Sequence, residues 1–85
     1  MPTLFDYLST AMDKEGDKSY NLMEANFQFF VKEKGLTVEQ TRKTLIYNYA
    51  LECAGIDTIE IREGLTTFEP DYVKRVMQHQ PEEQV

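Results

Sequence analysis

The side chains best suited to chemistry gather in residues 13–24, between two segments of apolar periodicity. Oxygen-bearing residues fill the first, third, fifth, seventh, ninth and twelfth places of this window. They are Asp13, Glu15, Asp17, Ser19, Asn21 and Glu24. Calcium prefers about six to eight oxygen ligands, which one tight loop supplies when acids alternate and a two-oxygen Glu closes it. The spacing therefore predicts a calcium site in this window.

The window resembles the calcium loop of the EF-hand family, and the resemblance extends over the helices expected on either side. It implies side-chain oxygens from the three acids at the start of the window and a backbone carbonyl from Ser19. It also implies a direct or water-bridged contact from Asn21 and bidentate closure by Glu24. Calcium is thus the one cofactor that the sequence suggests.

A second window, residues 52–63, repeats part of the pattern thirty-nine residues later. It again has Gly in fourth place and Glu in twelfth, with Ile59 in the eighth place, where paired EF-hands typically carry Ile. Ala54 and Ile56 stand where acids belong. This second loop is therefore expected to be metal-free and structural.

Three residues in the first window depart from the EF-hand pattern. Lys18 stands in sixth place, where Gly normally provides a positive φ, at a cost on the order of 1 kcal/mol. Tyr20 replaces a small aliphatic residue, and Glu15 is longer than the usual Asp. Such a site would be weak. The alternative is that Gly16 and Gly55 end helices and that the acids form a solvated turn.

Length and charge narrow the possible classes of protein. The chain has 85 residues and a net charge of −6, with a pI of about 4.6. This charge argues against an autonomous nucleic-acid binder, which normally carries a basic patch. A single Cys and a single His exclude an internal disulfide and a zinc constellation. Without a signal-peptide pattern or an apolar run of membrane-spanning length, we expect a soluble, cytoplasmic protein or a domain of a longer one.

Catalysis is not expected. His79 lies in the last predicted helical turn, where it is expected to be solvated and favoured by the helix dipole. Cys53 lies on an apolar stripe with no His nearby in sequence, so it is expected to be a small core residue. The sequence contains no serine nucleophile motif and no glycine-rich phosphate loop. We therefore expect a non-enzymatic protein.

Periodicity predicts a mostly α fold, a compact four-helix domain with a short strand or hairpin before the last helix. The expected helices cover residues 2–13, about 20–34, 37–54 and 71–80, and the strand covers residues 58–62. Pro2 is expected in the first turn of the first helix and Pro70 in the first position of the last. Thr37 and Gln40 form an expected capping box. Residues 1–80 then make one domain, and residues 81–85 a fraying polar tail.

Apolar residues at helical spacing mark the expected core faces. In the first helix they are Leu4, Phe5, Leu8, Ala11 and Met12. In the second they are Leu22, Met23, Phe27, Phe30 and Val31. In the third they are Val38, Leu45, Ile46, Tyr49, Ala50 and Cys53.

Aromatic rings occur on more than one face of the second and third helices. Both helices are therefore either buried widely or expose a ring as an anchor for a partner, and the residues proposed for that role are Phe29 and Tyr47. The sequence thus favours a small acidic regulatory or adaptor protein that binds a protein partner, or a second copy of itself, through an apolar helix face.

Two alternative functions remain open at the level of sequence. One is a ribbon-helix-helix transcriptional regulator with its strand at residues 20–23, although Ser19, Asn21 and Met23 are poor base readers and the charge has the wrong sign. The other is an acidic inhibitor that blocks a basic nucleic-acid-binding protein, which the net charge permits.

Overall fold

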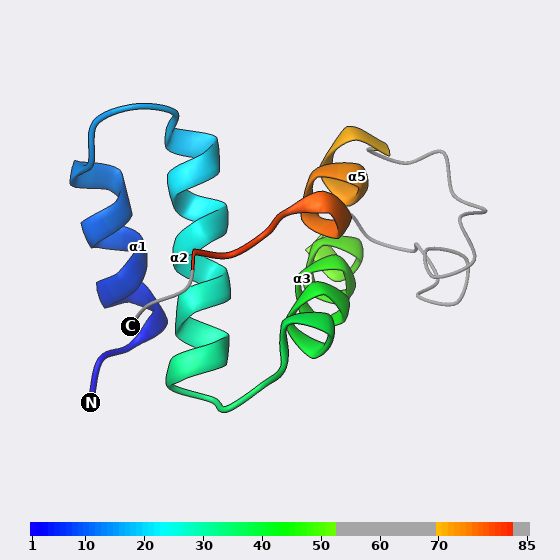
Figure 1. The fold of residues 1–85 in the computed structure, drawn as a ribbon, viewed down its shortest axis with the longest axis horizontal. Helices are drawn as coiled ribbons and strands as arrows, with labels where there is room; N and C mark the ends of the chain where they lie inside the picture. The colour runs from blue at the N-terminus through cyan, green and yellow to red at the C-terminus, as the bar shows by residue number, and fades with distance from the viewer. Residues whose placement is uncertain (53–69, 83–85) are drawn as a thin grey trace. The chain divides into compact units, whose positions relative to one another are not determined.

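The computed structural model describes residues 1–52 and 70–82, which contain four helices and no strand (Figure 1). The helices are α1 (Leu4–Asp13), α2 (Lys18–Lys32), α3 (Val38–Glu52) and α5 (Pro70–Gln78). The predicted mostly helical class is confirmed over this part of the chain. The predicted strand at residues 58–62 lies outside the described residues, as do Cys53 and all but the first residue of the window at 52–63.

The chain divides into two compact units. The first contains Met1–Thr41 and Gln80–Val85, and the second contains Arg42–His79. The sequence predicts one domain over residues 1–80 followed by a separate tail, whereas the contacts group the tail with the N-terminal helices. The chain therefore leaves the first unit near the start of α3 and returns to it at Gln80.

Helix α1 begins with a reciprocal capping box. Thr3 is the N-cap, and its hydroxyl accepts from the Asp6 N–H at 3.2 Å, while the Asp6 carboxylate accepts from the Thr3 N–H at 2.8 Å. The pair satisfies N–H groups that the helix itself leaves without partners. Pro2 consequently lies before the N-cap, and its predicted place in the first turn of the helix is wrong.

The turn between α1 and α2 requires a residue without a side chain at Gly16. Gly16 has a φ of +99°, a conformation that other residues adopt only with strain. Asp17 then caps α2, and its carboxylate accepts from the Tyr20 N–H at 3.2 Å. The Lys18 ammonium donates to the Met12 carbonyl at 2.6 Å. Its positive charge there complements the C-terminal end of the α1 dipole.

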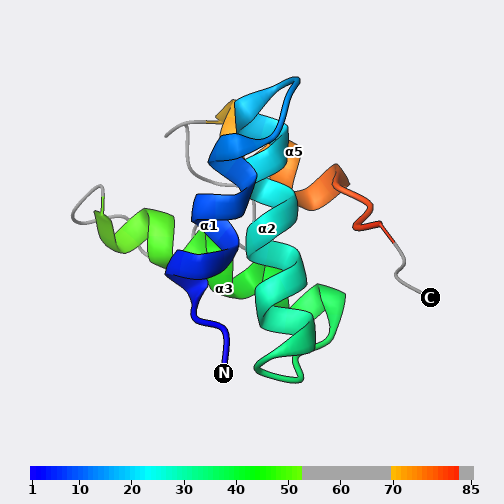
Figure 2. The same cartoon turned by 90° about the vertical axis from the view of Figure 1, so that its left-hand side faces the viewer.

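Helices α1 and α2 form an antiparallel hairpin, seen with α1 in front in Figure 2. The buried apolar residues of this hairpin are Ala11, Ala25, Phe27 and Phe29. The Phe29 ring meets Tyr7 of α1 edge to face at a centroid distance of 5.5 Å, and it meets Phe30 at 5.2 Å. These contacts join the two helices through aromatic packing.

The buried face of α2 differs from the predicted one. Phe27 is buried as expected, but Leu22, Met23, Phe30 and Val31 are only half-buried. Their places in the interior are taken by Glu24, Ala25, Gln28 and Phe29. The reason is that two polar residues of α2 face a segment from the far end of the chain, a partner that helical periodicity does not reveal.

The link from α2 to α3 turns at Gly35 and leads into a predicted capping box. Gly35 has a φ of +70°, and the Leu36 N–H donates back to the Phe30 carbonyl at 3.0 Å. The predicted capping box at the start of α3 is confirmed. The Thr37 N–H donates to the Gln40 side chain at 2.9 Å, and the Gln40 N–H donates to the Thr37 hydroxyl at 3.1 Å.

The second unit joins α3 to α5 through a stacked ring pair and a buried cation. Tyr49 stacks on Tyr72 with centroids 4.1 Å apart and an interplanar angle of 21°. Arg42 is buried, and its Nε donates to the Val76 carbonyl at 3.3 Å while its Nη2 donates to the His79 carbonyl. A guanidinium on α3 therefore satisfies carbonyls at the C-terminal end of α5.

Helix α5 begins at Pro70, as predicted, and ends at Gln78, two residues before the predicted end. His79 is buried rather than solvated, so its predicted exposure is wrong. Its N–H donates to the Val76 carbonyl at 3.4 Å. The physical reason is that Arg42 holds the end of α5, so the chain does not fray at His79.

Candidate functional site

The predicted calcium ligands fall half before α2 and half inside it. Those before α2 are Asp13, Glu15 and Asp17, and those inside it are Ser19, Asn21 and Glu24. Helix α2 begins at Lys18, the sixth place of a window in which the EF-hand calcium loop takes all twelve places. Among the residues that the structure describes, no three His, Cys, Asp or Glu side chains are grouped so as to hold a metal ion.

The predicted closing ligand, Glu24, is buried and already hydrogen-bonded. Its carboxylate accepts from the Gln28 side chain at 2.9 Å and from the Glu82 N–H at 3.1 and 3.2 Å. Calcium binding through Glu24 stays a prediction, which calorimetric titration of chelator-stripped protein decides. Heat that is lost in Glu24→Gln supports it, and no heat at millimolar calcium contradicts it.

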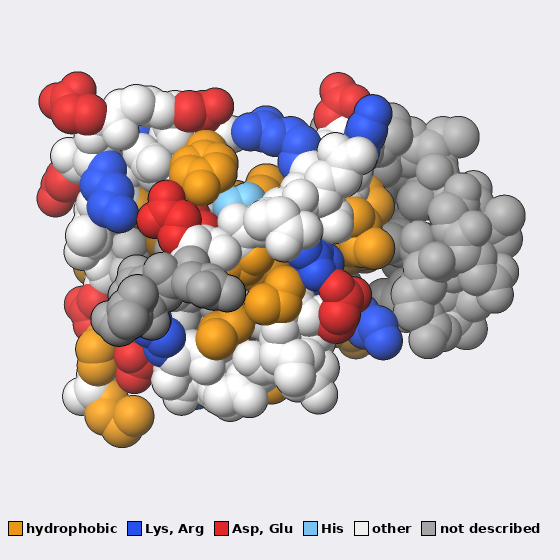
Figure 3. Space-filling view, in the orientation of Figure 1, with side chains coloured by type: hydrophobic (Ala, Val, Ile, Leu, Met, Phe, Trp, Pro, Cys, Tyr) orange, Lys and Arg blue, Asp and Glu red, His pale blue; other side chains and the backbone are white. Residues whose placement is uncertain are grey.

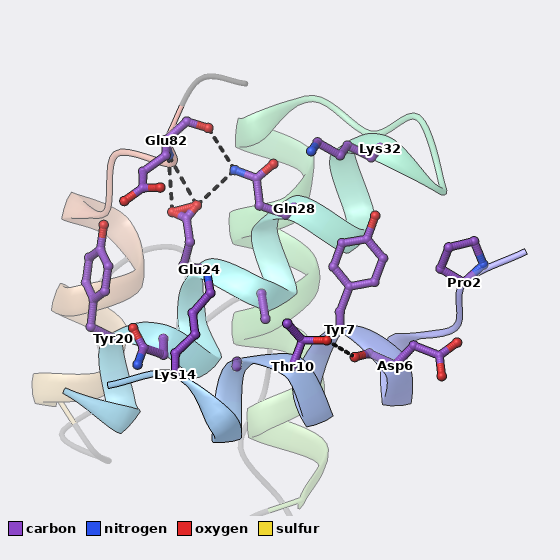
Figure 4. Close-up of a pocket in the computed structure, with 13 residues that line it drawn as sticks. Pro2, Asp6, Tyr7, Thr10, Lys14, Tyr20, Glu24, Gln28, Lys32 and Glu82 are labelled. Atoms are coloured by element: carbon purple, nitrogen blue, oxygen red, sulfur yellow. Dashed lines mark hydrogen bonds between the residues drawn. The ribbon is translucent and has the colours of Figure 1, made fainter. Parts of the chain in front are cut away.

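The first unit contains a cavity of about 370 Å³ along α1 and α2 (Figure 4). Tyr7 of α1 and Lys14, the residue after α1, line it, and Tyr20, Gln28 and Lys32 are among the lining residues of α2. The lining carries both signs of charge, because the carboxylates of Asp6, Glu24 and Glu82 also belong to it. The cavity therefore suits a polar ligand better than an apolar one.

Glu82 is held in this cavity by its backbone. Its N–H donates to the Glu24 carboxylate, and its carbonyl accepts from the Gln28 side chain at 2.8 Å (Figure 4). Gln28 also donates to Glu24, so the two side chains hold each other in place. Both backbone groups of Glu82 therefore have partners on α2.

Electrostatics at the cavity follow from these contacts. Desolvation raises the pKa of the Tyr20 phenol, and the charges of Glu24 and Glu82 and a side-chain hydrogen bond to Glu82 raise it further. At the other end, the Thr3 backbone N–H and then its side chain hold the pKa of the Asp6 carboxyl below its usual value. Tyr20 therefore stays a neutral phenol beside two carboxylates at physiological pH.

Tyr7 links α1 to the end of α2, and its removal gives a pH-dependent prediction. The Tyr7 hydroxyl donates to the Glu33 carboxylate at 2.7 Å, and this hydrogen bond, then desolvation, then the charge of Glu33 raise the pKa of the phenol. Because the neutral phenol is the donor, its contribution to stability is complete below the usual pKa of about 10 and is lost as the pH rises through the raised pKa.

We therefore expect Tyr7→Phe to lower the free energy of unfolding by about 1 kcal/mol at neutral pH. Above the raised pKa of Tyr7, the difference between the variant and the wild type should shrink. Urea denaturation at neutral and alkaline pH measures both values. A difference that is unchanged at high pH would show that the Glu33 hydrogen bond is not its source.

The outer face of α1 exposes large apolar side chains. Phe5 is 76% exposed and Met12 is 52% exposed, although both belong to the predicted core face. At about 100° per residue, Phe5 and Met12 lie within about 20° of each other around the helix. They lie about 100–120° away from the buried Ala11, with the half-buried Leu8 between. The expectation that Phe5 and Met12 are core residues is wrong, because α1 packs on α2, its neighbour in the first unit, through the side that carries Ala11.

The two residues proposed as partner anchors lie in different units. Phe29 is 7% exposed and packs within the first unit, so its ring is a core contact. Tyr47 is 48% exposed on α3, and Leu51, one helical turn later, is exposed as well. Of the two residues, Tyr47 is therefore exposed and Phe29 is not.

Comparison of the chain with models of protein families, with curated proteins and with solved structures found no match. None of the helices in the described ranges is both long enough and apolar enough to cross a membrane. The ribbon-helix-helix alternative requires a strand at residues 20–23, and these residues are helical as part of α2. The functional argument therefore rests on the surfaces of the two units themselves.

Proposed function

We propose that this protein is a non-enzymatic interaction module that binds a protein partner through the outer face of α1. The observation that carries the proposal is the exposure of Phe5 and Met12 on one side of a helix that packs on α2 through another side, about 100–120° away around the helix. Burying a large apolar side chain contributes about 1.5–3 kcal/mol. Two such residues beside the half-buried Leu8 make a compact apolar surface, the outer α1 face.

Charge around this face supports a partner of complementary character. The exposed acids Asp6 and Asp13 lie on α1, and the chain as a whole carries a net charge of −6. Acidic and basic side chains are interspersed over α1 and α2 on the side shown in Figure 3. A partner with an apolar helix rimmed by basic residues fits the outer α1 face, because rim charges set specificity and association rate.

A second copy of the chain provides a direct test, since one apolar stripe can pair with its own copy about a two-fold axis. Sedimentation equilibrium from micromolar to millimolar protein is expected to show reversible dimerisation. Phe5→Glu should weaken it by at least about tenfold, because a charge replaces a buried ring in both copies. Met77→Glu on α5, where Met77 is also exposed, adds the same charge elsewhere and should leave dimerisation unchanged.

Circular dichroism of both variants separates a loss of binding from a loss of folding. A wild-type protein that stays monomeric at millimolar concentration contradicts self-association. Equal weakening by the Phe5 and Met77 substitutions would show that net charge, and not the outer α1 face, governs association.

A further inference from the structure

The contacts to Glu82 have the form of a peptide-binding site. Both backbone groups of this residue are bonded by side chains of α2, its N–H by Glu24 and its carbonyl by Gln28. All three bonds use groups that every residue except proline carries. The Glu82 side chain is itself exposed, and Tyr20 stands beside it (Figure 4). The contacts that hold Glu82 therefore depend mainly on its backbone and less on its side chain.

We propose that the cavity along α1 and α2 is the docking site for an extended acidic peptide segment of a partner protein, and that the segment of this chain around Glu82 is its intramolecular competitor. The site is separate from the outer α1 face. In the complex, Glu24 and Gln28 bond the N–H and carbonyl of one peptide residue, and the Tyr20 hydroxyl donates to its acidic side chain.

The dimensions of the cavity fit a segment longer than the residue it now holds. Its lining on α2 runs from Tyr20 to Lys32, which is about 18 Å at a rise of about 1.5 Å per residue. An extended chain covers that length with about five or six residues. Among the described residues of the C-terminal segment, Glu82 lines the cavity.

The residue already docked indicates which side chain the occupant carries. Lys14 and Lys32 line the cavity together with the carboxylates of Asp6 and Glu24, and the docked residue is the acidic Glu82. Glu24 is engaged with N–H groups and so acts as an acceptor for the peptide backbone. A peptide that binds in the same way must therefore present the backbone N–H and carbonyl of a residue whose side chain is acidic.

Competition between the two segments determines the apparent affinity. When the intramolecular segment occupies the site for more than nine-tenths of the time, a free peptide binds more than about tenfold more weakly than to the open site. Glu82→Pro removes the N–H that donates to Glu24 and leaves the lining from α1 and α2 unchanged. This variant opens the site without altering the groups that receive the peptide.

The test titrates an acetylated peptide with the sequence of residues 80–85 into the full chain, with the Gln28 side-chain amide as the NMR reporter. Glu82→Pro should bind the peptide at least about tenfold more tightly than the wild type. Glu82→Ala, which keeps the N–H, is the matched control and should bind more weakly than Glu82→Pro. A peptide N-methylated at the residue equivalent to Glu82 should bind neither protein.

The proposal is overturned if the wild type and Glu82→Pro bind the peptide with equal affinity. It is also overturned if the N-methylated peptide binds as tightly as the unmodified peptide. If Glu82→Pro fails to fold, the peptide titration of the wild type tests the proposal by itself. At millimolar peptide, the Glu82 amide signal should move as its segment is displaced. A stationary Glu82 signal in the presence of bound peptide overturns intramolecular competition.

Discussion

Replacing Phe27 by Ala is expected to lower the free energy of unfolding by about 3–5 kcal/mol. Phe27 is 0% exposed and is the largest fully buried side chain in the described residues. Its removal loses the transfer energy of a ring and leaves a cavity that the neighbouring helices fill only in part. Urea denaturation followed by circular dichroism measures the change.

Phe5→Ala is the matched control for this prediction. The same substitution at a residue that is 76% exposed should change stability by less than about 0.5 kcal/mol. The contrast separates the core from the outer α1 face with one type of residue. A large loss at Phe5, equal to that at Phe27, would show that Phe5 belongs to the core and would remove the binding surface.

Replacing Arg42 by Met is the second large effect, with an expected loss of about 3 kcal/mol. Arg42 is buried, and it donates to the carbonyls of Val76 and His79. Methionine fills a similar volume but donates to neither carbonyl. The Val76 carbonyl keeps the His79 N–H as a donor, whereas the loss at the His79 carbonyl costs about 1–3 kcal/mol. The favourable charge at the C-terminal end of α5 is lost as well.

Two controls define the source of the Arg42 effect. Lys43→Met removes a positive charge at the next, exposed position and should change stability by less than about 0.5 kcal/mol. Arg42→Lys keeps the charge but not the planar fork of donors, so it should fall between the wild type and Arg42→Met. If Arg42→Met leaves the free energy of unfolding unchanged, burying the guanidinium costs as much as its hydrogen bonds contribute.

Much of the helical framework could be predicted because its signals are local. The capping box of Thr37 and Gln40 and the position of Pro70 each depend on residues within one helical turn. The box at Thr3 was equally local, but Pro2 gave a competing signal for the same end of α1. The predicted helix ends therefore lie within a few residues of the observed ends wherever a single local signal is present.

The candidate site could not be predicted, because its contacts are long-range and use ordinary residues. Glu24 and Gln28 bond the backbone of Glu82 more than fifty positions later, and a backbone N–H has no signature in sequence. The rhythm of acids that predicted a calcium loop is used in part for helix ends, as Asp17 caps α2. Helical periodicity likewise placed Phe5 on the apolar face of the first helix. It did not show that Phe5 is exposed on that helix.

The most direct test of the proposed function uses the four methionines of the chain as reporters. With methyl-labelled methionine, NMR spectra recorded from micromolar to millimolar protein follow Met12 on the outer α1 face, Met23 on α2 and Met77 on α5. We expect the Met12 methyl signal to shift with concentration while those of Met23 and Met77 stay in place. A shift at Met77 alone, or no shift at any methionine, would contradict self-association through the outer α1 face.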